Sequence, residues 1–252
     1  MSMADAIVES YKRWERKPAD LYPTPVDATE SIIPLIQALS IREDGEGLLQ
    51  VDRTGMDGRN ITRVWEPACG DGRLSRVLEW HGMDVTSSDL REFPGYGTPG
   101  VDFLKPSVEA CFKYDAIITN PPFALAKEFL IRARSLAPVV IFLLKQNYWN
   151  TKGRIPLWDE HRPTFFLPIT WRLAFLKEER GSSPLMDCAW CVWIDGMDEE
   201  CFFEPVRKRV YPGYHGKGLV GAQAGLTEAV DALAGLLLAL RATNHGSDPD
   251  EI

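Results

Sequence analysis

Four consecutive residues, Asn120-Pro121-Pro122-Phe123, have the composition of a site that grips an amino group. They follow an apolar run, AIIT, that is typical of a buried strand, and they precede a helical pattern. Neither proline carries a backbone N–H, so the tetrapeptide cannot continue a sheet and is expected to form a rigid, extended turn. The Asn120 Oδ1 atom and the Pro121 carbonyl then offer two acceptors to the two N–H groups of a planar amine.

A planar exocyclic amine is a poor nucleophile because its lone pair is delocalised into the ring that bears it. Accepting both hydrogens favours the localised lone pair that attacks, so the stabilisation grows as the new bond forms. Phe123 offers a ring that can stack on the base. The pattern therefore predicts a catalytic site; the alternative is a structural stop in which Asn120 caps the helix.

A glycine-containing turn, EPACGDG at residues 66–72, lies at the end of an earlier predicted strand. Glycines there let the backbone pass close to a ligand. The Glu66 carboxylate suits an amino group better than a phosphate. No Lys-Ser/Thr follows the last glycine, so the turn is not a phosphate-binding loop of the NTPase kind. Asp89, about 20 residues further on, is placed to accept ribose hydroxyls. Asp102 could accept from an adenine amine with Phe103 against the ring, although each acid alone also fits an ordinary cap or turn.

Strand and helix patterns alternate along the chain, which indicates a mainly parallel sheet covered on both faces. Two late strands with no helix between them, 171–176 and 188–194, are expected to form an antiparallel hairpin. Residues 44–60 are expected to be an exposed loop. We expect strands at 63–68, 84–90, 101–104, 114–120 and 139–147, and helices at 25–40, 73–82 and 124–137.

The net charge of -8 argues against a protein that coats nucleic acid nonspecifically, but it leaves room for a local basic face. One candidate is 206–218, and a looser set comprises Lys145, Lys152, Arg154, Arg162 and Arg172. The odd count of 5 cysteines fits a reducing cytoplasm. Cys188 and Cys191 should point to opposite faces of a strand, so no metal is expected. We also expect no membrane span and no secretory signal.

Five motifs occur in the order found in one subgroup of the DNA adenine-N6 methyltransferases, a family that the chain resembles: YPTP, EPACGDG, SSDL, VDFL and TNPPF. The segment SSPLMDCAWCVW, residues 182–193, is similar to small methyltransferases of phage and prophage type. The resemblance implies a single Rossmann-like α/β domain over 1–252, with a mostly parallel seven-stranded sheet and a C-terminal antiparallel hairpin. It also implies S-adenosylmethionine as cofactor and the cytoplasm of a bacterial or phage-infected cell.

The resemblance further implies roles for individual residues. Asn120, Pro121, Pro122 and Phe123 would act on the target base. Phe175 would help to hold that base after it is flipped out of duplex DNA. The cofactor would contact Tyr22, Thr24, Glu66, Ala68, Gly70, Asp89, Asp102 and Phe103.

Recognition of DNA would fall to short segments, because the chain leaves little room for a separate recognition domain. Candidate contacts are Arg207, Lys208 and Arg209, and candidate loop insertions are 148–168 and 202–218. A helix at 219–242 is expected to pack on the domain or to form an oligomer contact, and a homodimer could supply specificity.

Three other functions use the same sequence features. The chain could methylate RNA or protein glutamine with the same Asn-Pro-Pro-Phe site. It could be a catalytically silent subunit that presents nucleic acid to a partner. It could also be a non-enzymatic DNA-binding module, against which the acidic charge and the lack of a helix-turn-helix or zinc pattern weigh.

Overall fold

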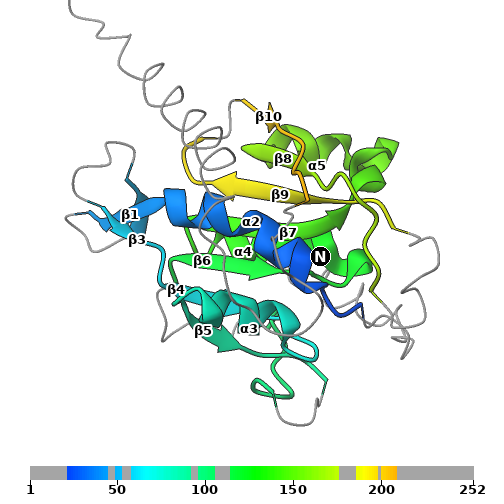
Figure 1. Cartoon of the computed structure of the whole chain (residues 1–252). Helices are drawn as coiled ribbons and strands as arrows, with labels where there is room; N and C mark the ends of the chain where they lie inside the picture. Colours follow the sequence, from blue (N-terminus) through cyan, green and yellow to red (C-terminus); the bar gives the residue numbers. More distant parts are fainter. Residues whose placement is uncertain are drawn as a thin grey trace, which may run out of the picture.

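A seven-stranded sheet forms the centre of the protein, as the computed structural model in Figure 1 shows. The structure describes residues 22–44, 49–52, 58–91, 96–105, 114–175, 186–197 and 200–208. The strand order is β10-β8-β9-β7-β6-β4-β5. The bounds are β4 Arg63–Glu66, β5 Asp84–Ser87, β6 Ala116–Thr119, β7 Val139–Lys145, β8 Phe165–Pro168, β9 Cys188–Ile194 and β10 Phe202–Phe203.

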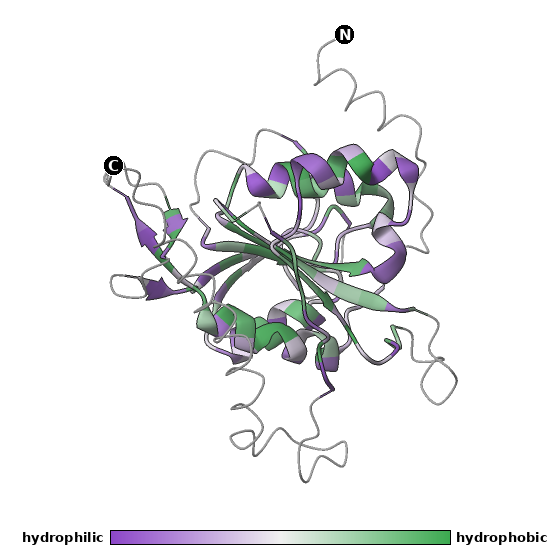
Figure 2. Ribbon diagram, turned by 90° about the horizontal axis from the view of Figure 1, so that it is seen from above, coloured by the Kyte–Doolittle hydropathy of each residue, from purple (hydrophilic) through white to green (hydrophobic). Residues whose placement is uncertain are grey.

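All neighbouring strands of this sheet pair in parallel, except that β9 runs antiparallel to both β7 and β8. Helices cover both faces of the sheet (Figure 2). The helices are α2 Val26–Ala38, α3 Arg73–Trp80, α4 Ala126–Arg134 and α5 Ile155–Glu160, with short 3-10 turns η2 Phe123–Leu125, η3 Gln146–Trp149 and η4 Lys152–Arg154. The predicted Rossmann-like α/β fold, a mostly parallel seven-stranded sheet with helices on both faces (Figure 2), is confirmed, and its antiparallel strand is β9, between β7 and β8.

The two faces of the sheet build two separate apolar clusters, because successive strand residues point to opposite sides. Ile118 of β6 and Ile141 of β7 pack with α2 and α3. Ile117 and Val140 pack with α4 on the other face. All of β6 is buried, as expected for a strand covered on both sides.

Several local expectations are wrong. Residues 101–104 form a turn and no strand. The segment 171–176 is not the hairpin partner of β9: its described part makes only a single bridge, Leu173 to Met186, and β8 takes that place. The segment 148–168, expected as a loop insertion, contains η4, α5 and β8.

Residues 44–60 are not simply an exposed loop. A second, three-stranded antiparallel sheet is built from β1 Ser40–Glu43, β2 Leu49–Val51 and β3 Arg59–Asn60. Arg59 ties it to the main sheet, since its guanidinium makes two hydrogen bonds, of 2.7 and 2.8 Å, to the buried carboxylate of Asp115. Burial alone would raise the pKa of Asp115, but the bonds from Arg59 and from the amides of Arg63 and Thr62 lower it to about 2.

Some expectations fall on parts of the chain outside the described residues. They include the helix at 219–242, Arg209, and most of the basic segment 206–218. Within the described ranges, no helix has the length and the apolar content needed to cross a membrane.

Candidate active site

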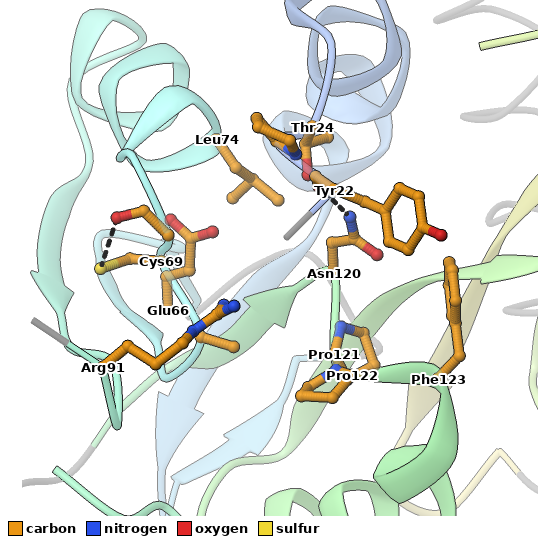
Figure 3. A pocket seen from close by; sticks show the side chains of 13 residues that line it. Tyr22, Thr24, Glu66, Cys69, Leu74, Arg91, Asn120, Pro121, Pro122 and Phe123 are labelled. Carbon is orange, nitrogen blue, oxygen red and sulfur yellow. Dashed lines mark hydrogen bonds between the residues drawn. The ribbon is translucent and has the colours of Figure 1, made fainter. Parts of the chain in front are cut away.

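A cavity opens at the carboxyl ends of β4 and β6, where the Asn-Pro-Pro-Phe turn faces the glycine turn (Figure 3). This is the edge at which open α/β sheets bind ligands. The segment before α2 closes the cavity from a third side. The lining residues are Tyr22, Pro23, Thr24, Glu66, Ala68, Cys69, Gly70, Leu74, Arg91, Asn120, Pro121, Pro122 and Phe123.

The amide of Asn120 is held in one orientation. Its Nδ2 atom donates a hydrogen bond of 2.9 Å to the backbone carbonyl of Tyr22, 98 residues away in the sequence. Figure 3 shows this bond joining the turn after β6 to the segment that leads into α2. Because the amide nitrogen is used in this way, Oδ1 remains as an acceptor for a ligand, beside the carbonyl of Pro121.

Aromatic rings surround the acceptor side of the cavity. The ring centroids of Tyr22 and Phe123 lie 5.8 Å apart, and those of Tyr22 and Phe175 lie 5.7 Å apart with the rings edge to face. The Lys145 ammonium lies 4.7 Å from the Phe123 ring centroid. Phe175 is only 1% exposed and does not line the cavity, so it supports Tyr22 from the core.

Glu66 places a carboxyl group deep in the cavity. Glu66 is 2% exposed, and the Ser75 hydroxyl donates a hydrogen bond to its Oε2 atom. Burial raises the pKa of Glu66 to about 8, against the lowering effect of the Ser75 hydrogen bonds, and the nearby Asp89 and Asp71 raise it further. Among the described residues no cation pairs with this carboxyl group, so an ammonium group that binds in the cavity would be its partner.

The glycine turn brings its backbone to the cavity through positive φ angles. Gly70 has φ 57° and Gly72 has φ 77°, conformations that side chains with a Cβ rarely adopt. The Gly70 amide donates a 3.0 Å hydrogen bond to Asp89 Oδ2. Asp89 thus fixes the turn, and it also pairs with Arg91 at 3.3 Å.

Three predicted cofactor residues lie away from the cavity lining. Asp89 is 4% exposed and sits behind the glycine turn. Asp102 accepts a hydrogen bond from the amide of Leu104 within its own turn. Phe103 is 2% exposed and packs in the core, 5.1 Å from the Trp65 ring and 4.8 Å from the Phe129 ring.

Four cavity residues were missed by the sequence analysis: Pro23, Cys69, Leu74 and Arg91. Pro23 and Cys69 lie inside the motifs YPTP and EPACGDG, in which the neighbouring residues were the predicted contacts. Arg91 follows Asp89 by two positions and pairs with it, and its side chain lines the cavity (Figure 3).

Two of the predicted basic substrate contacts lie within the described residues and outside the cavity lining. Arg207 and Lys208 are exposed. Lys208 lies 3.2 Å from Asp27 of α2 and 5.7 Å from the ring centroid of Trp171. Trp171 also donates a 3.0 Å hydrogen bond to Asp27, so one carboxylate holds both side chains. Phe175, the predicted base contact in this segment, lies in the core, whereas Trp171 is half-buried.

Cys188 and Cys191 are buried on opposite faces of β9, one in each apolar cluster. Burial raises the pKa of each thiol to about 12. The two side chains point to opposite faces of the sheet, which agrees with the interpretation of this pair as two core residues.

No family model matches the chain, and no curated protein matches its sequence. Solved structures are similar to it at low identity. A Listeria monocytogenes protein described as a class I S-adenosylmethionine-dependent methyltransferase is 11% identical over 95% of this chain and 76% of its own, with a TM-score of 0.48. A Vibrio vulnificus modification subunit, described as part of a type I restriction enzyme, is 11% identical over 83% of this chain and 51% of its own, with a TM-score of 0.47. A Pyrococcus horikoshii protein described as an RNA methyltransferase is 14% identical over 77% of this chain and 98% of its own, with a TM-score of 0.44.

Proposed function

We propose that the protein transfers a methyl group from S-adenosylmethionine to the N6 amine of adenine in DNA. The observation that carries the proposal is the tethered amide of Asn120. Its Nδ2 atom is held by the Tyr22 carbonyl at 2.9 Å, which leaves Oδ1 and the Pro121 carbonyl as paired acceptors beside the cavity that contains Glu66.

The residues of the cavity fit the cofactor. The buried carboxyl of Glu66 suits its α-ammonium group, and the glycine turn at Gly70 lets the backbone approach closely. Thr24 and Ala68 also line the cavity. When bound, S-adenosylmethionine supplies an electrophilic methyl group on a sulfonium.

Asn120 and Pro121 act on the acceptor. By accepting both N6 hydrogens they would favour the localised lone pair, which would bond to the methyl carbon as the sulfur–methyl bond breaks and S-adenosylhomocysteine leaves. The rigid turn keeps the two acceptors in place, so little reorganisation is needed during the reaction. No side-chain base is required before attack, and the surplus proton leaves to water afterwards.

The aromatic wall supports an aromatic acceptor. Phe123 offers a stacking surface for a base, and Tyr22 packs against it at 5.8 Å. Adenine N6 cannot be attacked inside a duplex, so the base must leave the stack to reach this wall.

Substitution of Asn120 tests the proposal. Asn120→Ala should lower the single-turnover rate of DNA methylation by roughly 100- to 1,000-fold, comparable to the loss of one preorganised contact in other enzymes. Binding of S-adenosylhomocysteine, measured by calorimetry, should stay within a few-fold of the unsubstituted protein. Asn60→Ala, on exposed β3, is the matched control and should change neither quantity. Equal losses of cofactor binding and rate in Asn120→Ala would contradict the role given to this amide.

A further inference from the structure

The sheet edge that holds the cavity continues beyond it. Because β7 and β8 each pair antiparallel with β9, they run in the same direction, and β10 runs parallel to β8. The carboxyl ends of β6, β7, β8 and β10 therefore lie on one side of the molecule. Neighbouring strands are about 4.8 Å apart, so the edge from β6 to β8 is roughly 14 Å long.

Cations sit beside aromatic rings along this edge. At the end of β7, the Lys145 ammonium lies 4.7 Å from the Phe123 ring centroid. In the segment after β7, the Arg154 guanidinium lies 3.8 Å from the Tyr148 ring centroid. These distances are within the range of cation–π attraction, which holds each half-buried cation against its ring. The Tyr148 ring is itself buried, whereas the Phe123 ring is partly exposed.

A further cation–aromatic pair lies beyond the ends of β8 and β10. Lys208 is 5.7 Å from the Trp171 ring centroid, and Asp27 accepts from Trp171 and pairs with Lys208 at 3.2 Å. The Lys208 side chain is 57% exposed. Arg172 is also exposed and pairs with Asp187 at 3.2 Å, so two acids temper the positive charge at this end.

The edge is a fixed surface and not a set of independent loops. Gln146 follows Lys145 directly, and its Nε2 atom donates to the backbone carbonyls of Cys188 at 3.2 Å and Ile169 at 3.4 Å. These bonds join the ends of β7, β9 and β8. The spacing between the Lys145 and Trp171 regions is therefore set by the sheet.

Alternating cations and rings match the chemistry of an unpaired polynucleotide. Phosphates would meet the cations, and exposed base faces would stack on or beside the partly exposed rings of Phe123 and Trp171. In a duplex the base faces are hidden, so this pattern favours a single strand. Lys145 and Arg154 place positive charge at this edge. The chain as a whole has a net charge of -8, which repels nucleic acid.

We propose that single-stranded DNA lies along this edge, with a phosphate at Lys145 next to the target base and the strand continuing to Trp171 and Lys208. The inference rests on the proposed function, since it uses the same cavity for the acceptor base. It adds that the acceptor is an unpaired DNA segment, which lies along the edge from Phe123 to Trp171.

Fluorescence anisotropy with a labelled 12-nucleotide oligonucleotide tests the surface, at several salt concentrations and with S-adenosylhomocysteine present. The single strand should bind more tightly than the duplex of the same sequence. Lys145→Ala and Lys208→Ala should each reduce the slope of log affinity against log salt by about 0.7, the value for one phosphate contact on a single strand. Lys105→Ala, an exposed lysine after the turn at 101–104, should leave the slope unchanged.

Tighter binding of the duplex, no binding of either form, or unchanged slopes in both lysine variants would overturn the proposal. Methyl transfer to the same oligonucleotides separates this outcome from a failure of the proposed function. If the slopes change as expected but no methyl transfer occurs, the DNA-binding surface is supported and the proposed methyltransferase activity is rejected. Methyl transfer that is indifferent to Lys145→Ala and Lys208→Ala would keep the activity and remove the surface.

Discussion

Replacing Glu66 with Gln should change the way stability depends on pH. Burial raises the pKa of Glu66 to about 8, whereas its ordinary value is 4.5. For a carboxyl whose pKa is raised on folding, the contribution to stability is fully present below pH 4.5 and is lost as the pH rises through about 8. The unsubstituted protein should therefore lose stability over this window.

The size of the loss follows from the shift in pKa. Each unit of difference between the folded and unfolded states corresponds to about 1.4 kcal/mol, so the full window amounts to at most about 5 kcal/mol in the free energy of unfolding. An amide at this position does not titrate. Glu66→Gln should have a flatter profile and should be the more stable form above pH 8.

Urea unfolding followed by tryptophan fluorescence measures this effect at pH 5, 6.5 and 8.5. The difference between Glu66→Gln and the unsubstituted protein should grow with pH. Glu200→Gln, at an exposed position, serves as the control and should follow the unsubstituted protein throughout. A difference that is the same at all three pH values would refute the reasoning, because Glu66 would then not change its protonation on folding.

The same carboxyl links cofactor binding to a proton. If the α-ammonium group pairs with Glu66, binding favours the charged form and releases close to one proton at pH 7. Calorimetry of S-adenosylhomocysteine binding in phosphate and in Tris should show this release from the difference in heat. Glu66→Gln should release none, and a release of zero from the unsubstituted protein would contradict the pairing.

Three further predictions concern the scaffold. Asp115→Asn should lower the free energy of unfolding by about 2 kcal/mol, measured in urea, because the buried carboxylate accepts hydrogen bonds from Arg59 and from the amides of Thr62 and Arg63; a loss below about 0.5 kcal/mol would contradict this. Gly72→Ala should lower the melting temperature more than Gly82→Ala, since both have positive φ but only the Gly72 Cβ would overlap a side chain, the Tyr96 ring; equal losses would show that the ring moves aside. Cys188 and Cys191 should resist iodoacetamide at pH 8 in the native protein, as mapped by mass spectrometry, because burial raises each pKa to about 12; rapid labelling would contradict their burial.

The sequence predicted the central strands well because their signals are local. The runs at β6 and β7 are apolar up to their last residues, Thr119 and Lys145. Proline follows β6 at position 121 and precedes β7 at position 138. The predicted hairpin between 171–176 and β9 was wrong for a related reason. Leu173 and Phe175 alternate like strand residues and are buried, yet packing alone buries them. The actual partner of β9, Phe165–Pro168, ends in a proline and resembled a loop.

The residues of the site were predictable where they follow a strand end directly. Asn120 and Glu66 are fixed by the sheet itself, so their position in the motif decides their place in space. The places of Phe103 and Arg91 depend on where each side chain points after a turn. Tertiary packing decides that direction, and the local sequence does not. Phe103 turned into the core, and Arg91 turned toward the cavity.

The most direct test of the account is methyl transfer from labelled S-adenosylmethionine by the full chain to single-stranded DNA, duplex DNA, RNA and protein, followed by digestion and identification of the labelled product. The account predicts N6-methyladenine from DNA, absent when Asn120→Ala replaces the unsubstituted protein. Label confined to RNA, to protein, or to a DNA nucleoside other than adenosine would contradict it.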